Sequence, residues 1–412
     1  MNYRRAGWAL FVLTGLNFVN YIDRSVLFAV QPLIQSEFHR SDAEFGFLTS
    51  AFIICYMCTA PFIGPLADRF QRRRIMVIGA LIWSAATLLT AVTFSFETLF
   101  IRHLIVGIGE ATFVTIAPAF LSDIFPEHKR GRIMAIFSAA LPMGYAIGYM
   151  VGGKLGEAYG WRHAFLIASI PGFILALMLL FVQEPTRGAE DHLKETVERG
   201  TILGLRKNAA FWSCTLGMAM MTFATSGMSV WMPTFLVRVR SVPLARANFI
   251  FGAVTLVSGF LATVIGGWLG DYLLRYTKGA YYLVSAIGMA LAVPAIYMAV
   301  TYTGSAMYPS IFLAEFMLLV NTAPLNAAMV NSVSARIRAT ASAVNIFFLH
   351  ALGDALSPTV MGRISDESHG NLRLSFLAVT VAVALSAIIL FWGIRKAPDL
   401  KVPDEAPGAV QV

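Results

Sequence analysis

The segment GPLADRFQRRR, residues 64–74, lies between two long apolar stretches and decides how the chain is organised. Its glycine permits close helix packing, its aspartate stands at the end of the first stretch, and its arginines form a cationic turn before the second. A short, strongly basic turn between two such stretches is typical of a cytoplasmic loop that joins two membrane-spanning helices. The segment therefore predicts a helical membrane protein.

The composition of the whole chain agrees with this prediction. Of 412 residues, 57% are apolar and 13% are charged, and the mean hydropathy is +0.69, whereas ordinary soluble domains are roughly 45–50% apolar. A spanning helix needs about 20 apolar residues, and twelve stretches qualify: 7–35, 43–66, 75–94, 98–122, 132–153, 163–183, 209–236, 247–270, 281–302, 306–329, 338–362 and 372–394. We predict an all-α membrane protein with twelve transmembrane helices and no sizeable water-soluble domain.

The distribution of charge predicts the orientation of these helices. The formal net charge is +8, from 31 basic and 23 acidic residues. With the amino terminus inside, most of the basic residues fall in cytoplasmic segments, including 69–74, 129–132 and 336–338. The positive-inside rule therefore places both termini in the cytoplasm. We expect the protein to lie in the inner membrane of the cell. Topology accounts for the basic excess, and no nucleic-acid partner is expected.

The two halves of the chain repeat each other. Three motifs recur in the second half: Ala117-Pro118 as Ala323-Pro324, Arg130-x-Arg132 as Arg336-x-Arg338, and Gly64-x-Leu66-x-Asp68 as Gly267-x-Leu269-x-Asp271. Parallel repeats of six helices are a transporter architecture, with the substrate site near the midplane between them. We predict six-helix bundles at 1–183 and 209–394, a cytoplasmic linker at 184–208 and a cytoplasmic tail at 395–412.

Two levels of family resemblance follow from the motifs. The segment at residues 64–74 resembles the loop signature of the major facilitator superfamily, although Gln71 stands where many members have glycine. A finer resemblance, to the Spinster family, rests on motifs in the first half: Asn20-Tyr-Ile-Asp23-Arg24, Trp83-Ser-Ala, Gly107-Ile-Gly109-Glu110-Ala-Thr, Thr115-Ile-Ala-Pro118, Asp123-Ile-Phe125 and Pro142-x-Gly144-x-x-x-Gly148-Tyr149. The resemblance implies a transporter of lysolipids or sphingolipids, proton-coupled in some members, of the short bacterial type without the polar tails of animal members.

Ionisable residues inside the predicted spans are the candidate functional site. A charge at the centre of a spanning helix costs about 2.5–3.5 kcal/mol on insertion scales, so such residues need a functional or structural reason. Helix rise places Glu110 near the midplane and Asp23 somewhat outward, where both can border one cavity. Burial favours a neutral carboxyl and a nearby arginine favours an ionised one, so the pair can exchange protons as access alternates.

These considerations, together with the resemblance, assign roles to three residues. We predict that Asp23 and Glu110 are the proton-coupling residues, and that Arg24 and Glu110 contribute to substrate binding. Arg24 serves as counter-ion to a carboxylate and as a forked donor for an anionic head group. The alternative is a permanent polar network that ties helices together.

A second group of residues predicts a gate. Gly64, Asp68, Arg69, Arg72 and Arg73 lie at the cytoplasmic ends of two helices, where a helix dipole and opposite charges can hold a closed state. The alternative is that the arginines only anchor the loop at anionic membrane lipids.

Four further polar residues have open roles. Glu315 corresponds to Glu110 in the repeat and is either functional or a packing remnant. His350 and Asp354 share a helix face, so a proton relay is possible, although an interhelical hydrogen bond is the simpler expectation. His103 stands where the Spinster pattern has arginine, with Arg102 just before it; it can titrate near neutral pH or be an ordinary interfacial histidine.

The function predicted is secondary active transport of an amphipathic lipid, coupled to protons, by rocking of the two bundles. The alternative is proton-coupled transport of a small organic anion. The sequence contains neither a phosphate-binding Gly-x-x-x-x-Gly-Lys loop nor a His-Glu-x-x-His zinc motif, so no cofactor, metal or enzymatic activity is predicted. Cys55, Cys58 and Cys214 lie in apolar stretches and imply no disulfide. A membrane-embedded lipid enzyme would need a nucleophile or metal constellation that is not found. We expect a monomer.

Overall fold

The computed structural model describes residues 3–186, 204–334 and 337–398, and within them it contains helices and no strand. Most of the predicted linker and tail therefore lies outside the described residues, as does Arg336 of the repeated motif.

Helices of the first half form six spans. Their bounds are α1 (Tyr3–Ala29) with the short α2 (Gln31–Phe38), then α3 (Asp42–Arg69), α4 (Arg72–Thr90), α5 (Phe96–Ile124), α6 (Glu127–Tyr159) and α7 (Trp161–Leu179).

Helices of the second half form six more spans. After the short turn η1 (Leu205–Lys207) come α9 (Ala209–Arg238), α10 (Leu244–Leu273), α11 (Ala280–Thr301), η2 (Gly304–Ala306) with α12 (Met307–Leu319) and α13 (Thr322–Asn331), α14 (Arg338–Leu349) with η4 (His350–Asp354) and α15 (Ser357–Glu367), and α16 (Leu372–Ile394).

The prediction of twelve spans is confirmed. Within the described residues, ten helical segments are long and apolar enough to cross a membrane. Helices α1 and α9 are outside that group and complete the twelve. Both are long enough to span, and α1 carries the charges of Arg4, Arg5, Asp23 and Arg24.

Three spans are broken where the sequence analysis expects continuous helices. The first span ends its regular helix at Ala29, and α2 begins at Gln31 after one intervening residue, with Pro32 in its first turn, because proline lacks the amide donor that a continuous helix needs. The tenth span divides into α12 and α13. The eleventh contains η4, a π-helical turn of five residues at His350–Asp354. Such turns insert an extra residue into a helix and are frequent at functional sites.

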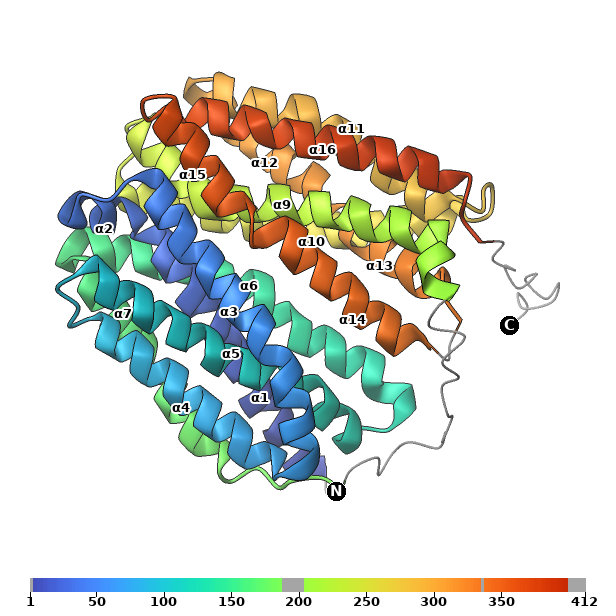
Figure 1. Cartoon of the computed structure of the whole chain (residues 1–412), viewed down its shortest axis with the longest axis horizontal. Coiled ribbons are helices and arrows are strands. Elements are labelled where there is room, and N and C mark those ends of the chain that lie inside the picture. The colour runs from blue at the N-terminus through green and yellow to red at the C-terminus, as the bar shows by residue number, and fades with distance from the viewer. Residues whose placement is uncertain (1–2, 187–203, 335–336, 399–412) are drawn as a thin grey trace, which may run out of the picture.

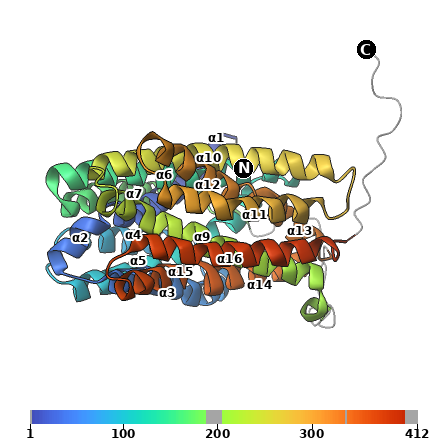
Figure 2. The ribbon, with the colours of Figure 1, turned by 90° about the horizontal axis from the view of Figure 1, so that it is seen from above.

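The helices are arranged as two bundles that lie side by side (Figure 1). The first bundle, blue to green, holds α1 to α7, and the second, yellow-green to red, holds α9 to α16. The view turned by 90° shows the long helices of both bundles running along a common axis (Figure 2). We call the end at which α1 begins and α16 ends the terminal end, and the opposite end, at which α3 begins and α15 ends, the distal end.

Helix starts follow local capping chemistry. Ser41 precedes α3 and accepts from the backbone N–H of Glu44, while the Glu44 carboxylate accepts from the N–H of Ser41, so two donors of the first turn are satisfied. Ser95 and Asn208 cap α5 and α9 by accepting from the backbone N–H groups of Thr98 and Phe211. In a bilayer these caps matter because an unpaired backbone donor cannot bind water.

A row of glycines on α6 lets α1 pack against it at backbone distance. A Cβ atom at Gly144 would lie 2.7 Å from the Phe18 carbonyl oxygen, and one at Gly148 would lie 2.7 Å from the Ile22 carbonyl oxygen. These distances are shorter than any normal contact of a Cβ atom, so the glycines set the separation of the two helices.

This contact predicts that Gly148→Ala destabilises the first bundle. The added methyl group has no space against α1, and overpacking of this kind costs about 1–3 kcal/mol. Gly131→Ala is the matched control, because it lies on the same helix and a Cβ there would meet nothing within 4 Å. We expect thermal unfolding in detergent to shift to lower temperature for Gly148→Ala only; equal unfolding temperatures for the two variants would contradict the packing role.

Candidate functional site

The centre of the candidate site is a buried ion pair between α1 and α5. Nε of Arg24 donates to Oε2 of Glu110 over 2.7 Å, and the two side chains are 12% and 0% exposed. Such a charge-assisted hydrogen bond in a buried setting is strong. Removal of either partner would leave an uncompensated charge, which costs about 3–5 kcal/mol in protein interiors. The structure thus joins two of the three residues predicted for coupling and substrate binding.

Aromatic rings enclose the remaining face of Arg24. Its guanidinium carbon lies 5.5 Å from the ring centre of Tyr21, 5.0 Å from that of Phe52 and 5.1 Å from that of Tyr56. Each arrangement is a cation–π contact, worth roughly 0.5–2 kcal/mol according to its desolvation. The rings hold the guanidinium in place without neutralising its charge.

Asp23 points in a different direction from its neighbour Arg24. Successive side chains on a helix are turned by about 100°, so Asp23 faces α4, where the hydroxyl of Thr87 lies 3.4 Å from Oδ2. Asp23 is 5% exposed. Its other oxygen, Oδ1, has no hydrogen-bond partner among the described residues. The arginine therefore pairs with Glu110, while Asp23 keeps only a weak contact with a hydroxyl.

A small internal cavity connects these groups. Its volume is about 10 Å³, and the residues that line it are Asp23, Arg24, Leu27, Thr87, Thr90, Leu99, His103, Val106, Glu110 and Phe165. This volume suits about one water molecule and no larger ligand. The predicted coupling residues thus border one cavity, but this cavity is no substrate chamber.

His103 lies inside the first bundle. It is 9% exposed, and its ring stacks on Phe52 with 4.7 Å between ring centres, so it is not the interfacial histidine that the simpler interpretation expects. Arg102, which precedes it, donates to the Leu89 carbonyl and to the Thr93 hydroxyl. Arg102 thereby binds the end of α4, since helix carbonyls there lack partners, and its charge does not reach the cluster around Arg24.

His350 and Asp354 interact within one helix. Nδ1 of His350 lies 3.0 Å from Oδ2 of Asp354 across the π-helical turn η4. The prediction that these residues form an interhelical hydrogen bond is therefore wrong. The ring of His350 also meets the ring of Tyr56 edge-on, with 5.8 Å between centres. Since Tyr56 belongs to α3, this contact joins the two bundles. The Tyr56 ring also contacts Arg24, so it lies between Arg24 and His350.

Glu315 lies apart from this cluster. It is buried in α12, and Oε1 has no hydrogen-bond partner among the described residues. Its position in the repeat matches that of Glu110, but no arginine corresponding to Arg24 contacts it in the described part of the second bundle. The structure therefore does not bring Glu315 into the site.

The predicted gate residues lie at the terminal end. Arg72 forms an ion pair of 2.6 Å with Asp123, and its backbone N–H donates to Glu184. Arg73 donates to the carbonyls of Leu180 and Val182. These bonds tie α4 to α5 and to the chain beyond α7, all within the first bundle.

The other three gate residues lie on the last turns of α3. Asp68 and Arg69 are exposed there. A Cβ atom at Gly64 would meet nothing within 4 Å, so the close packing expected at this glycine is absent from this conformation. The gating role of the group stays a prediction.

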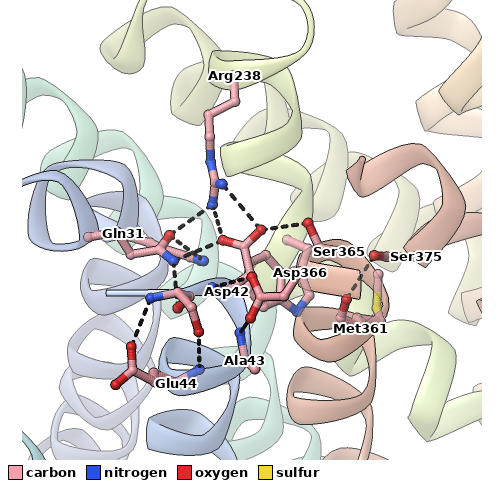
Figure 3. A network of polar contacts seen from close by, with 12 residues as sticks. Gln31, Asp42, Ala43, Glu44, Arg238, Met361, Ser365, Asp366 and Ser375 are labelled. Carbon is pink, nitrogen blue, oxygen red and sulfur yellow. Dashed lines mark hydrogen bonds and ion pairs between the residues drawn. The ribbon is translucent and has the colours of Figure 1, made fainter. Parts of the chain in front are cut away.

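At the distal end, a polar network joins the two bundles (Figure 3). We call Gln35, Asp42, Arg238, Ser365 and Asp366 the distal network. Arg238 of α9 binds the Asp42 carboxylate and the Gln35 side chain. The Ser365 hydroxyl donates to Asp42 over 2.6 Å. Because Gln35 and Asp42 belong to the first bundle and the other residues to the second, these bonds close the distal end.

Asp366 caps the first turn of α3 from the opposite bundle. Its carboxylate accepts from the backbone N–H of Asp42 over 3.0 Å and from that of Ala43 over 2.9 Å. An anion at a helix N-terminus satisfies free donors and interacts favourably with the helix dipole. Beside it, Gly362 and Gly46 leave no room for a Cβ atom against the backbone of the facing helix. Helices α3 and α15 are therefore in backbone contact.

Two parts of this arrangement are not apparent from the sequence. The rings of Tyr21, Phe52 and Tyr56 gave no signal, because aromatic residues are common throughout an apolar chain. The sequence Ser41-Asp-Ala-Glu44 does fit a capping box, and it could have located the start of α3. Nothing local indicates that Asp366 binds there, since 324 positions separate it from Asp42.

Comparisons with known proteins place this architecture in a class and then in a family. The profile of the major facilitator superfamily matches residues 13–358, and the chain is accordingly a multi-pass membrane transporter of that class and not an enzyme. It is 32% identical over 400 residues to protein spinster homolog 1 of Xenopus laevis, covering 92% of this chain and 76% of that one. The chain belongs to the Spinster family.

Two further relatives bear on function and conformation. The sphingosine-1-phosphate transporter SPNS2 of Xenopus tropicalis is 32% identical over 415 residues, which cover 95% of this chain and 81% of the relative. The crystal structure of a bacterial homolog of the human lysosomal transporter Spinster, in an inward-facing and unoccupied conformation, superposes with a TM-score of 0.85. Its sequence is 25% identical, and the match covers 96% of this chain and 98% of that one.

The distal network yields a prediction about Asp366. Asp366→Asn removes the charge from the N-terminus of α3, and a hydrogen bond to a charged group contributes about 1.5–3 kcal/mol, so the closed distal end should become less populated. Ser50 is buried beside Thr359 at this interface. In a background without native cysteines, we expect a Ser50→Cys reporter to react at least about tenfold faster with a polar thiol reagent when Asp366→Asn is present.

The matched control is Glu367→Gln, which removes the same charge from the next, exposed residue of α15. It should leave the reactivity of the reporter unchanged. Equal reactivity in the two variants would show that Asp366 does not hold the distal end closed.

Proposed function

We propose that this transporter carries an amphipathic lipid, such as a lysophospholipid or a sphingoid phosphate, across the membrane in a proton-coupled cycle. The observation that carries the proposal is the buried Arg24–Glu110 ion pair with Asp23 beside it. Three ionisable groups at this depth are costly, and in membrane proteins they mark substrate and proton pathways. Membership of the Spinster family supports the lipid class, because a relative is named as a sphingosine-1-phosphate transporter.

In the orientation we propose, the terminal end faces the cytoplasm of a cell whose inner membrane holds the protein. The basic turn of Arg69 to Arg74 lies at this end, as the positive-inside rule requires. The distal network then closes the outer side, and the transport cycle opens it by rocking one bundle against the other. The gate predicted at Gly64, Asp68, Arg69, Arg72 and Arg73 would close the cytoplasmic side in the alternate state.

Charge balance provides the coupling mechanism. With Asp23 and Glu110 ionised and Arg24 protonated, the cluster carries one negative charge, and a single bound proton makes it neutral. Moving a neutral cluster between the two access states avoids the desolvation of a net charge. One proton per cycle is the smallest number that meets this condition.

Substrate binding is linked to proton binding through Arg24. The hydrogen bond to Glu110 uses Nε, and the phosphate of a head group would bind the terminal nitrogens of the guanidinium in place of the neighbouring Tyr56 hydroxyl. A phosphate competes with Glu110 for the arginine, and once Glu110 loses its cation, its carboxyl binds a proton more readily. Each ligand therefore increases the affinity for the other, as linkage requires. The rings of Tyr21, Phe52 and Tyr56 provide an apolar surface beside the head group.

Transport of a small organic anion is the second candidate function. It would use Arg24 for a carboxylate and would gain from a second arginine in the same cluster. Among the described residues, no other arginine contacts Arg24, Glu110 or the aromatic rings around them, which favours the lipid. Uptake by proteoliposomes of a panel of lysolipids and small acids, with and without a pH gradient, decides between the two. Neither function requires a second copy of the chain.

The coupling role of Glu110 predicts the phenotype of Glu110→Gln. The neutral amide keeps the shape of the side chain but cannot exchange a proton, so uptake driven by a pH gradient should fall by about 100-fold or more. Exchange of substrate at equal pH should persist. Glu97→Gln is the control, because Glu97 lies on the same helix but is exposed and binds Arg40. Unchanged proton dependence of Glu110→Gln in proteoliposomes would reject the coupling role.

The head-group role of Arg24 predicts selective loss of affinity in Arg24→Ala. Hydrogen bonds to a charged group contribute about 1.5–3 kcal/mol, so binding of an anionic lysolipid should weaken at least about tenfold. Binding of a zwitterionic lysolipid with the same acyl chain should weaken less. The measurement is direct binding to purified protein in detergent, and equal losses for the two lipids would contradict the assignment.

A further inference from the structure

The small cavity beside Asp23 lies entirely inside the first bundle. Its walls come from α1, α4, α5 and α7, and none of the residues that line it belongs to the second bundle. The substrate of a two-bundle transporter passes between the bundles. The cavity is thus separate from the path of the substrate, although Asp23, Arg24 and Glu110 all reach it. We call it the chamber.

Two carboxylate oxygens of the chamber residues lack partners. Oδ1 of Asp23 and Oε1 of Glu110 are buried without a hydrogen bond of normal geometry from any described residue, although the Asn20 amide lies beside Glu110. An unsatisfied buried acceptor is costly, the more so when it is charged, and ordered water is the usual partner of such groups. The chamber has the volume of about one water molecule, and Thr87, His103 and the two acids offer that water polar contacts.

The neighbours Asp23 and Arg24 face different compartments. Arg24 is directed at Phe52 and Tyr56, and Tyr56 meets His350 of the second bundle. Asp23 faces Thr87 inside the first bundle. A head group that enters between the bundles therefore reaches Arg24 first, whereas a proton that resides on the chamber water reaches Asp23 first.

We propose that the chamber is a binding site for a single water molecule that delivers the coupling proton to Asp23 and Glu110 by a path separate from that of the substrate. This inference rests on the proton-coupled function proposed above and names the site of its proton. A hydronium ion of the aqueous phase gives its proton to the chamber water, which transfers one to the Asp23 carboxylate and is left neutral. When a head group takes Arg24 from Glu110, the same water accepts the proton from Asp23 and donates one to Glu110.

The charged and titratable groups around Asp23 permit this transfer. Arg24 of α1 is paired with Glu110 of α5, and His103 of α5 forms part of the chamber wall. Tyr145 of α6 packs against Tyr21, on the side of Arg24. The chamber residues of α4 and α7 are not titratable. Asp23 is accordingly the acid that faces the chamber without a cationic partner among the described residues.

Filling the chamber tests the separate path. Val106→Ile adds one methylene group to the chamber wall and leaves no space for the water, whereas Val12→Ile makes the same change in the core of α1, away from the chamber. With sphingosine 1-phosphate as the probe in proteoliposomes, we expect Val106→Ile to reduce uptake driven by a pH gradient at least about tenfold. Its exchange of the probe at equal pH should remain within about twofold of wild type. Val12→Ile should match wild type in both assays.

Two outcomes of this assay would overturn the proposal. Unchanged driven uptake in Val106→Ile would show that the proton does not need the chamber. A parallel loss of driven uptake and of exchange would show that the chamber serves the substrate path or the fold, and not the proton alone.

A second measurement is independent of the substrate. Infrared difference spectra of the purified protein between acidic and alkaline pH should contain an O–H band of a bound water, identified by its shift in oxygen-18 water, together with a protonated carboxyl band that Asp23→Asn removes. Thr87→Val should alter both bands, because it removes the hydroxyl that faces Asp23. Thr112→Val is the control, since the Thr112 hydroxyl donates to the Ile108 carbonyl of its own helix and lies outside the chamber wall.

The spectra separate failure of this inference from failure of the proposed function. Absence of an isotope-sensitive water band in wild type, or its persistence in Val106→Ile, would overturn the chamber assignment whatever the protein transports. Water and carboxyl bands in a protein that takes up no lipid would uphold the chamber and reject the lipid substrate.

Discussion

The structure depends on the high free energy of ionised groups in a bilayer. Asp23, Arg24 and Glu110 lie where water is scarce, and each must find a partner or lose its charge. Arg24 meets this requirement twice, with the Glu110 carboxylate and with three aromatic rings. Asp23 meets it only in part, through Thr87. Arg24 is fully paired and Asp23 is not, and this difference allows the cluster to bind and release a proton. A network in which every group is paired would have no reason to change its protonation.

The interactions inside each bundle differ from those that join the two bundles. Within the first bundle, α1 and α6 approach to backbone distance along the glycines of α6, and Arg72 is fixed by Asp123. Between the bundles, polar bonds of the described residues gather toward the distal end, around Asp42 and Asp366. Rigid bundles whose polar contacts are gathered toward one end are suited to move as units, since the bonds within each bundle can stay intact while those between the bundles break and re-form.

Much of this architecture follows from the sequence, and the part that does not has a physical reason. Hydropathy locates the spans because the bilayer imposes a length, and the cost of a buried charge singles out Asp23, Arg24 and Glu110. Spacing cannot show that Arg24 chooses Glu110 over its neighbour Asp23, because that choice depends on how α5 packs against α1. The contact of Asp366 with the start of α3 is likewise tertiary. The π-helical turn at His350 leaves no periodic signature, so a continuous helix was expected there.

That π-helical turn has a consequence for the shape of the molecule. The π-helical turn contains one residue more than an α-helical turn. This extra residue rotates the side chains that follow Asp354 by about 100° around the helix axis relative to those of α14. Gly362 of α15 faces α3, and the phase of α15 relative to α14 includes this offset. A single deletion in the turn would rotate an unaltered α15 so that bulkier side chains confronted α3, and the bundles would be wedged apart without any change in the residues that touch. The fit of the whole molecule is thus set by a count of residues as well as by their identity.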